Sequence, residues 1–320
     1  MTLRIGLIVP QGWRTDLAGI PDAVEAYETM TRVAQEAEHL GYHSLWLFDH
    51  FHTVPDPIQE VTFECWTSAA ALARDTKRIR IGQMVTGNSY RNPALLAKMA
   101  STVDVLSHGR LDFGIGAGWS EHEYRAYGYP FPSTPDRLRH LREAVQVILA
   151  LWTQDEAVFE GKYYHVQGAI NQPKGVQKPH IPLLIGGGGE QVTLKLVAQY
   201  ADACNISYVD VAGLQHKLSV LKKHCEIVGR EYESIRRTVL LMCAIAETKE
   251  EAYAKTLSLP FRRPIPAERV PETALVGTPD IIRQRLAAYE EAGAQEIILY
   301  MPDAKDLDAV RLFAETCLAR

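Results

Sequence analysis

The sequence alternates between short apolar runs typical of buried strands and longer segments with apolar residues at helical spacing. This alternation constrains the fold most, because a strand followed by a helix is the repeating unit of parallel α/β proteins. Eight such units in 320 residues favour a closed (β/α)8 TIM barrel over an open doubly wound sheet, which usually has fewer strands. The expected strands lie near residues 4–10, 44–48, 78–85, 110–116, 181–186, 203–207, 237–247 and 296–301.

The expected helices carry the residues that begin and end helices. Asp22 and Glu25 form a capping-box pattern at the start of the first helix, and Gly41 follows its last apolar residue. Thr278 is placed to cap the seventh helix, with a proline at the first helical position and Gly293 just past the end. These signals support the division into strand and helix units.

Two segments interrupt the repeat. Near residues 156–168, an aromatic stretch with glycine turns predicts a β-hairpin insertion. Residues 248–277 contain prolines and charges without a long apolar stripe, so we expect an excursion after the seventh strand, either a lid or a solvated loop. With these insertions, we expect residues 1–320 to form a single barrel domain.

The charge pattern limits the partners of the chain. It has 34 Lys and Arg against 39 Asp and Glu, a net charge of −5, and its basic residues form short pairs rather than a stripe. This argues against nucleic acid or an anionic membrane as the main partner. The first residues lack a signal-peptide pattern and no apolar run could span a bilayer, so we expect a cytoplasmic protein. Five cysteines without C-x-x-C spacing predict reduced thiols rather than disulfides or zinc ligands.

Functional residues of a TIM barrel lie on the loops at the carboxyl ends of its strands. The second strand, SLWLF, ends directly in Asp49 and His50. An isolated Asp-His pair is more often a polar turn, but this position makes both residues candidates for the site. His50 and His52 have no evident third ligand for zinc, so no metal site is expected and His52 is interpreted as a loop residue.

Glycines end two other strands. GIGAGW at residues 114–119 lies mid-chain and does not open a helix, so it is no Rossmann fingerprint, but its glycines allow the backbone to approach a phosphate or a flat ring. The four glycines Gly186 to Gly189 lie between a strand and a helix, where exposed N–H groups form an anion site. The alternative is a flexible turn. Together the two glycine-rich strand ends suggest that a phosphorylated cofactor binds across the mouth of the barrel.

Several ordered motifs carry a family resemblance. GYHSLWLFDHF, IGQMVTGNSYRNPALLAKMASTVDVLSHGRLDFGIGAGW and IPLLIGGGGEQVTLKLVAQYADACN together resemble the bacterial luciferase-like monooxygenase superfamily, and within it the coenzyme F420-dependent (deazaflavin) oxidoreductases. VGTPDIIRQRLAAYEEAGAQEIILYMP resembles the last unit of that family, so the resemblance runs nearly end to end. It implies a (β/α)8 barrel that binds F420 or FMN at the carboxyl-terminal rim and assembles as a homodimer or a larger oligomer.

The resemblance also implies roles for individual residues. Asp49 corresponds to an aspartate beside the deazaflavin ring, and His50 to the catalytic proton-transfer histidine. A non-prolyl cis peptide bond is expected at Met84-Val85, against one face of the ring. Two backbone segments correspond to positions near the cofactor phosphate, one of them Gly116, Ala117 and Gly118 and the other Gly186, Gly187, Gly188 and Gly189. The remaining cofactor-binding positions are Thr86, Gly87 and Trp119.

Two departures from the family concern the substrate. The sugar-phosphate dehydrogenase branch has a catalytic glutamate where this chain has Trp119, and a threonine where it has Ala117, which argues against glucose 6-phosphate. Trp13, Phe51 and Tyr208 join Trp119 as candidates for an aromatic pocket wall.

Three functions are compatible with these residues. The preferred one is hydride transfer between F420 and a small organic substrate, with His50 giving or accepting the proton and Asp49 orienting His50 or binding the cofactor. The second is an FMNH2-dependent monooxygenase, which needs a reductase partner and oxygen. The third is a flavin- or phosphate-binding barrel without catalysis.

Overall fold

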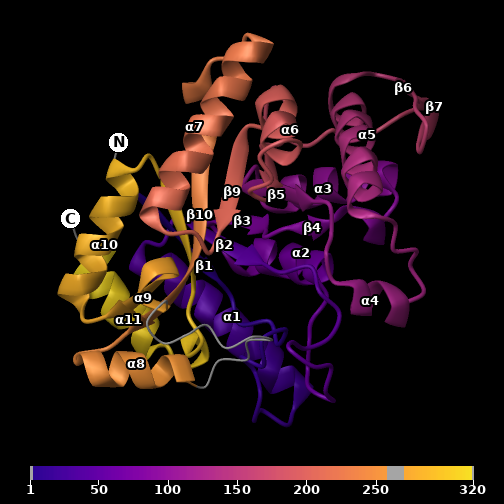
Figure 1. Cartoon of the computed structure of the whole chain (residues 1–320). Helices are drawn as coiled ribbons and strands as arrows, with labels where there is room; N and C mark the ends of the chain where they lie inside the picture. Colours follow the sequence, from indigo (N-terminus) through magenta and orange to yellow (C-terminus); the bar gives the residue numbers. More distant parts are fainter. Residues whose placement is uncertain (1–2, 258–269, 319–320) are drawn as a thin grey trace.

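The computed structural model describes residues 3–257 and 270–318. Within these ranges, eight parallel strands close into a barrel, because the last strand pairs with the first and sets Leu7 opposite Leu299. The expected (β/α)8 barrel is therefore confirmed (Figure 1). In barrel order the strands are β1 (Arg4–Ile8), β2 (Ser44–Leu47), β3 (Arg80–Gln83), β5 (Leu111–Gly116), β8 (Leu183–Gly186), β9 (Ala203–Ser207), β10 (Arg236–Ile245) and β12 (Glu296–Tyr300).

Helices surround the barrel, and their ends follow the capping signals of the sequence. The Asp22 side chain accepts a hydrogen bond from the Glu25 N–H at 2.8 Å, and Gly41 ends the helix with φ 88°. Thr278 precedes its helix in an extended conformation, but its side chain makes no capping hydrogen bond. The main helices are α1 (Ala23–Leu40), α2 (Cys65–Asp75), α3 (Pro93–Leu106), α5 (Thr134–Thr153), α6 (Thr193–Tyr200), α7 (Val211–Val228), α10 (Pro279–Glu291) and α11 (Asp308–Phe313).

Short elements complete the connections. Residues 88–90, 232–234 and 304–306 form single 3-10 turns, and 314–318 form a π-helical turn after α11. The strand β4 (Thr86–Gly87) pairs with β5, and α4 (Glu121–Ala126) lies between β5 and α5 in the sequence.

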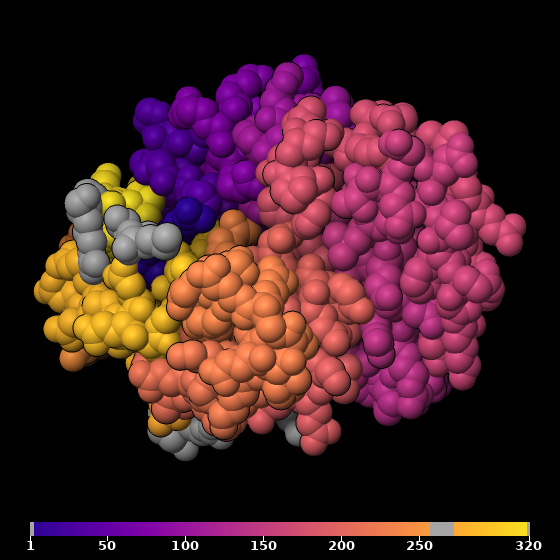
Figure 2. Space-filling view, turned by 90° about the horizontal axis from the view of Figure 1, so that it is seen from above, coloured from indigo at the N-terminus to yellow at the C-terminus, as the bar shows by residue number. Residues whose placement is uncertain are grey.

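Figure 2, seen from above, shows the yellow C-terminal segment beside the indigo N-terminal one, as closure of the barrel requires.

Apolar side chains form two layers of core. One layer fills the barrel interior and includes Trp46, Met84 and Tyr300, and the other lies between the strands and the helices. The interior has room for the indole of Trp46 because Gly82 on the neighbouring strand has no side chain. A Cβ atom at Gly82 would lie 2.4 Å from Trp46. The five cysteines are buried and none of them forms a disulfide bond, as expected.

The two interruptions differ in outcome. The hairpin is confirmed as β6 (Ala157–Glu160) and β7 (His165–Ala169), which lie outside the barrel beside α5 (Figure 1). The 248–277 segment is more regular than an excursion, since it contains α8 (Lys249–Leu257), α9 (Val270–Thr273) and β11 (Ala274–Gly277). Its strand pairs with the end of β10, which extends past its other neighbours, in the register Met242 to Ala274. Residues 258–269 lie outside the described residues.

Charged side chains are buried at the amino-terminal ends of the strands. Asp112 accepts hydrogen bonds from Arg80 Nε at 2.6 Å and from Arg236 Nη2 at 2.8 Å. Glu296 accepts from Ser44 Oγ at 2.5 Å and lies 3.6 Å from Arg236. Burial raises the pKa of Asp112, but the two guanidinium groups lower it more, so this carboxyl stays ionised.

Among the helices in the described ranges, none is long and apolar enough to cross a membrane.

Candidate active site

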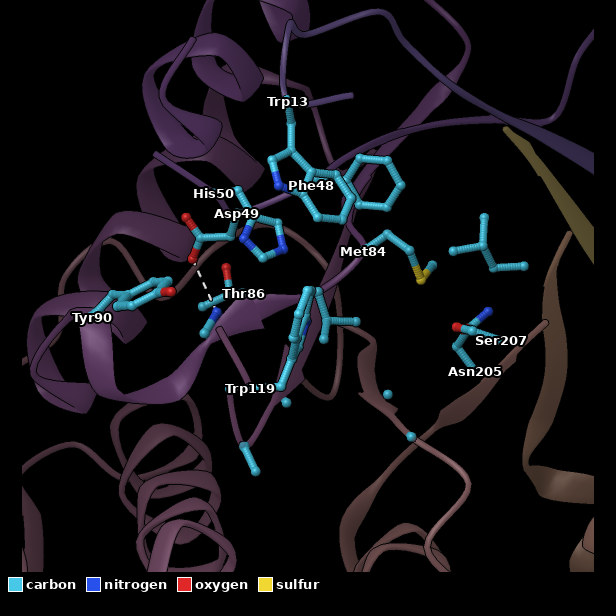
Figure 3. A pocket seen from close by; sticks show the side chains of 18 of the residues that line it. Trp13, Phe48, Asp49, His50, Met84, Thr86, Tyr90, Trp119, Asn205 and Ser207 are labelled. Atoms are coloured by element: carbon cyan, nitrogen blue, oxygen red, sulfur yellow. Dashed lines mark hydrogen bonds between the residues drawn. The ribbon is translucent and has the colours of Figure 1, made fainter. Parts of the chain in front are cut away.

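A cavity of about 470 Å³ opens at the carboxyl-terminal ends of the barrel strands. This volume is in the range that holds a small molecule or part of a cofactor. Loops after several different strands form its wall, so residues far apart in the sequence face one space (Figure 3). The lining residues are Trp13, Arg14, Phe48, Asp49, His50, Met84, Val85, Thr86, Gly87, Tyr90, Gly116, Ala117, Gly118, Trp119, Gly186, Gly187, Thr193, Asn205, Ser207, Tyr208 and Leu240.

Nearly all of the residues predicted for the site line this cavity. The exceptions are Gly188 and Gly189. The helix α6 begins at Thr193 rather than directly after the glycines, because a turn at 190–192 separates them. A Cβ atom at Gly189 would lie 2.8 Å from Thr193 Oγ1, whereas Gly188 faces Ile206.

His50 is held by a carboxylate and an indole. Its Nδ1 lies 2.6 Å from Glu123 Oε2, and its ring stacks on Trp13 with centroids 3.9 Å apart and planes 4° apart. Glu123 is fully buried and also accepts hydrogen bonds from the Phe51 N–H at 2.8 Å and the Tyr90 hydroxyl at 3.1 Å. The imidazole is therefore fixed in position and orientation.

The charge of Glu123 determines what His50 can do. Burial raises the pKa of Glu123, but the hydrogen bond and charge of His50, with the Phe51 N–H, lower it more, and the pKa lies below its ordinary value. An ionised Glu123 accepts the proton on Nδ1, which assigns the tautomer of a neutral His50. Among the described residues Nε2 makes no hydrogen bond, so it is the nitrogen left for a ligand in the cavity.

Glu123 was not among the residues predicted from the sequence. It lies on α4, a helix of six residues, and contacts a histidine 73 positions earlier. The available signal was the segment EHEYRA directly after the glycine-rich end of β5, on the rim where functional groups gather.

The Asp49 carboxylate hydrogen-bonds groups other than the imidazole of His50. It accepts hydrogen bonds from the Gly87 N–H at 3.0 Å, drawn as the dashed line in Figure 3, and from Arg91 Nη1 at 2.7 Å and Nη2 at 3.1 Å. Arg91 also contacts Glu64 at 2.5 Å. Asp49 thus ties the end of β2 to the segment after β3, and Glu123 rather than Asp49 is the carboxylate that hydrogen-bonds His50.

Val85 lies where two strand-end glycines leave room for it. The peptide bond Met84-Val85 is cis, as expected. A Cβ atom at Gly116 would lie 2.7 Å from Val85 Cγ2, and one at Gly186 would lie 2.9 Å from Val85 Cγ1. The absence of side chains at these two glycines therefore sets how far Val85 extends into the cavity.

A polar group lies across the cavity from Asp49 and His50, as Figure 3 shows for Asn205 and Ser207. Asn205 Nδ2 donates to Thr238 Oγ1 at 2.9 Å, and Ser207 Oγ donates to Asn205 Oδ1 at 2.8 Å. The helix α6 begins on this side without a side-chain cap. The Leu194 N–H donates to Gly189 O at 2.9 Å, so within the described residues the N–H groups of Thr193 and Lys195 are the ones left in the first turn for an anion.

The aromatic wall is only partly as predicted. Trp13, Trp119 and Tyr208 line the cavity, whereas Phe51 does not. Its backbone turns toward Glu123, and its ring packs 4.5 Å from Tyr90 and faces a neighbouring cavity of about 520 Å³. The prediction for Phe51 was wrong because a loop has no periodicity from which the direction of a side chain follows.

Asp16 is a buried carboxyl in the loop after β1. It accepts a hydrogen bond from the Gly12 N–H at 2.6 Å. Burial raises the pKa of Asp16 from 3.8 to about 6, against the backbone hydrogen bonds and the charge of Arg14, which lower it. Folded Asp16 therefore retains a proton between pH 4 and 6 that the unfolded chain releases.

This difference predicts how stability depends on pH. As the pH rises from 4 to 6, the wild type should lose on the order of 2 kcal/mol of unfolding free energy relative to Asp16→Asn, which cannot ionise. Urea unfolding of both proteins at pH 4, 5, 6 and 7 measures the difference. A difference that stays constant across this range would contradict the assignment.

Comparison with known proteins identifies the family of the chain and proteins that share its fold. The sequence profile of the family described as luciferase-like monooxygenase matches residues 4–272. An uncharacterised protein of Mycobacterium tuberculosis is 34% identical over 190 residues, which span 54% of this chain and 66%, just under two thirds, of that protein. A protein of Gordonia bronchialis named F420-dependent glucose-6-phosphate dehydrogenase is 27% identical over 85% of this chain and 87% of its own length.

Solved structures share the barrel at lower identity. An F420-dependent secondary alcohol dehydrogenase in complex with an F420-acetone adduct superposes with a TM-score of 0.84 at 20% identity, over 100% of this chain and 99% of that chain. A monooxygenase from Streptomyces bottropensis superposes with a TM-score of 0.79 at 23% identity, over 99% of both chains. These similarities establish a shared fold.

Proposed function

Because the chain belongs to the luciferase-like monooxygenase family, we propose that it is an oxidoreductase that transfers a hydride between coenzyme F420 and a small organic substrate. The cofactor choice is supported by relatives named as F420-dependent enzymes, which align over most of the chain. The observation that carries the proposal is a cavity that combines a fixed His50–Glu123 pair with glycine-lined strand ends.

The residues of the cavity fit a flat, phosphorylated cofactor. Gly116 and Gly186 give space that side chains would fill, and Met84 and Val85 offer apolar surface to a ring. The first turn of α6 offers the N–H groups of Thr193 and Lys195 to a phosphate. Gly187, whose own N–H donates to Asn205 O at 2.9 Å, lines the cavity without a side chain. We also assign five residues to the part of the cavity that would hold the cofactor ring: Thr86, Gly87, Ala117, Gly118 and Trp119. Gly188 and Gly189 serve only as the connection to the helix.

Two carboxylates prepare the site in different ways. Glu123 keeps the proton of a neutral His50 on Nδ1, so that Nε2 can accept a proton from the substrate, or return one in the opposite direction. Asp49 holds the Gly87 N–H and Arg91, and so fixes the segment after Val85 against the cofactor side of the cavity. Bound F420 would accept the hydride when the substrate is oxidised and supply it when the substrate is reduced, and the protein would provide the proton position and the dry surroundings.

Titration of the purified protein with F420 and with FMN, followed by fluorescence, tests the cofactor assignment. We expect saturable binding of F420 and weaker binding of FMN. Saturable binding of FMN alone would instead support an FMNH2-dependent monooxygenase, which needs a reductase as partner. Binding of either cofactor without turnover of any substrate would leave a non-catalytic barrel.

We propose that the substrate is not glucose 6-phosphate, although several relatives carry that name. Trp119 presents an indole 5.5 Å from the ring of His50 and supplies no carboxylate to the reaction. Turnover of glucose 6-phosphate with oxidised F420, at a rate comparable to other substrates, would contradict this assignment.

Gly116→Ala should weaken F420 binding by about tenfold or more, because the new Cβ pushes Val85 into the cavity. The same titration of wild type and variant measures the effect. The second change Val85→Ala removes the displaced methyl groups, so Gly116→Ala/Val85→Ala should bind F420 more tightly than Gly116→Ala alone. A double variant no better than the single one would show that Val85 is not the obstacle.

A further inference from the structure

We propose that the cavity selects a substrate with a single negative charge, a carboxylate on an apolar or aromatic body, and that Arg14 binds the carboxylate. This inference rests on the proposed function because it concerns the substrate of the same site. Arg14 lies in the loop after β1 and lines the same cavity as His50. A carboxylate held there would lie beside the proton-transfer site.

Arg14 is surrounded by aromatic rings. Its guanidinium carbon lies 4.6 Å from the centroid of Trp13, 5.1 Å from Tyr300 and 5.7 Å from Tyr208. Its Nη2 donates to the Tyr208 hydroxyl at 3.1 Å, and its enclosed Nε has no hydrogen-bond partner among the residues that the structure describes. Aromatic faces stabilise a cation but do not neutralise it. Four of its five N–H donors make no hydrogen bond to the described part of the chain.

The acidic side chains of this region hydrogen-bond or pair with groups other than Arg14. Asp16 accepts from the Gly12 N–H and lies beyond 4.0 Å of the guanidinium, since no ion pair joins it to Arg14. Asp303 pairs with Lys255 at 2.6 Å. Asp49, the acid on the cavity wall, pairs with Arg91. Arg14 is thus a cation without an ion-pair partner in residues 3–257 and 270–318.

The count of charges favours a monoanion. Arg14 is the single Lys or Arg on the described cavity wall, so one negative charge balances it, whereas a phosphate dianion usually meets more than one cation. A guanidinium also matches a carboxylate in shape, with two parallel N–H donors. The indoles of Trp13 and Trp119 on the same wall suit a flat or apolar substrate body.

Backbone geometry supports a built site. Thr15, next to Arg14, has φ 57°, and its partner Tyr208 has φ 52°, a left-handed conformation that costs free energy for residues other than glycine. Left-handed backbone is therefore found at Tyr208 and at the residue next to Arg14, although the two ends of the contact are 194 positions apart. Such conformations concentrate where a side chain must be aimed.

The test measures binding without turnover. Hexanoate, benzoate and cinnamate, each paired with its primary amide, are titrated into the protein, and binding is followed by tryptophan fluorescence and calorimetry. The variants are Arg14→Gln and, as a matched loss of one charge, Arg125→Gln, an exposed arginine of α4 that pairs with Glu121. F420 and glucose 6-phosphate are titrated into the same proteins.

We expect at least one carboxylate to bind about tenfold or more tightly than its amide, with this preference lost in Arg14→Gln and kept in Arg125→Gln. F420 affinity should change less than twofold in both. Three results overturn the inference: no carboxylate preferred over its amide, F420 weakened by Arg14→Gln as much as the carboxylate, or glucose 6-phosphate bound more tightly than every carboxylate. If the wild type does not bind F420, the proposed function is refuted instead, and the carboxylate preference can still be measured.

Discussion

Replacing His50 with Gln should lower turnover with F420 by about 10²- to 10⁴-fold, the range typical of a lost general acid or base. F420 affinity should change little, because the cofactor contacts that we propose come from backbone and apolar groups on other strands. The amide of Gln can still donate to Glu123 but cannot exchange a proton with the substrate. Steady-state kinetics and F420 titration on the same preparations separate the two effects.

Two controls locate the effect in the His50–Glu123 pair. His52→Gln changes a histidine of the same loop whose Nε2 lies 3.1 Å from His122, off the cavity wall, and should leave turnover within about twofold. Glu123→Gln should lower turnover by itself, yet add little to His50→Gln, because Glu123 acts through the imidazole. Full turnover in His50→Gln, or additive losses in the double variant, would contradict the assigned roles.

The barrel and its active rim were predictable because burial imposes periodicity. Strands covered on both faces are continuous apolar runs, and the polar residue that follows each run marks the rim. The sequence alone therefore predicts that Asp49, His50 and the glycines at the ends of β5 and β8 lie at one end of the barrel.

The partners of these residues were not predictable, because they come from loops with no periodicity. Glu123 lies on α4 beside Glu121, whose side chain is exposed and pairs with Arg125. Nothing in the local sequence distinguishes the two glutamates; only the packing of α4 over His50 does. The contact between Arg14 and Tyr208 likewise joins two loops that closure of the barrel brings together.

The amino-terminal end of the barrel carries the largest expected effect on stability. Asp112→Ala should lower the unfolding free energy by about 3–5 kcal/mol, because it leaves the half-buried Arg80 and Arg236 without the buried carboxylate that they share. Urea unfolding at neutral pH measures the loss. Glu121→Ala, which breaks the exposed pair with Arg125, should cost less than about 1 kcal/mol.

Asp112→Asn distinguishes charge from packing in this network. Asn keeps the volume of Asp and one acceptor oxygen but not the negative charge that the two guanidinium groups share. If the charge dominates, as the lowered pKa of Asp112 indicates, Asp112→Asn should lose nearly as much stability as Asp112→Ala. A loss below about 1 kcal/mol for Asn would show that Glu296, 3.6 Å from Arg236, suffices to balance the arginines.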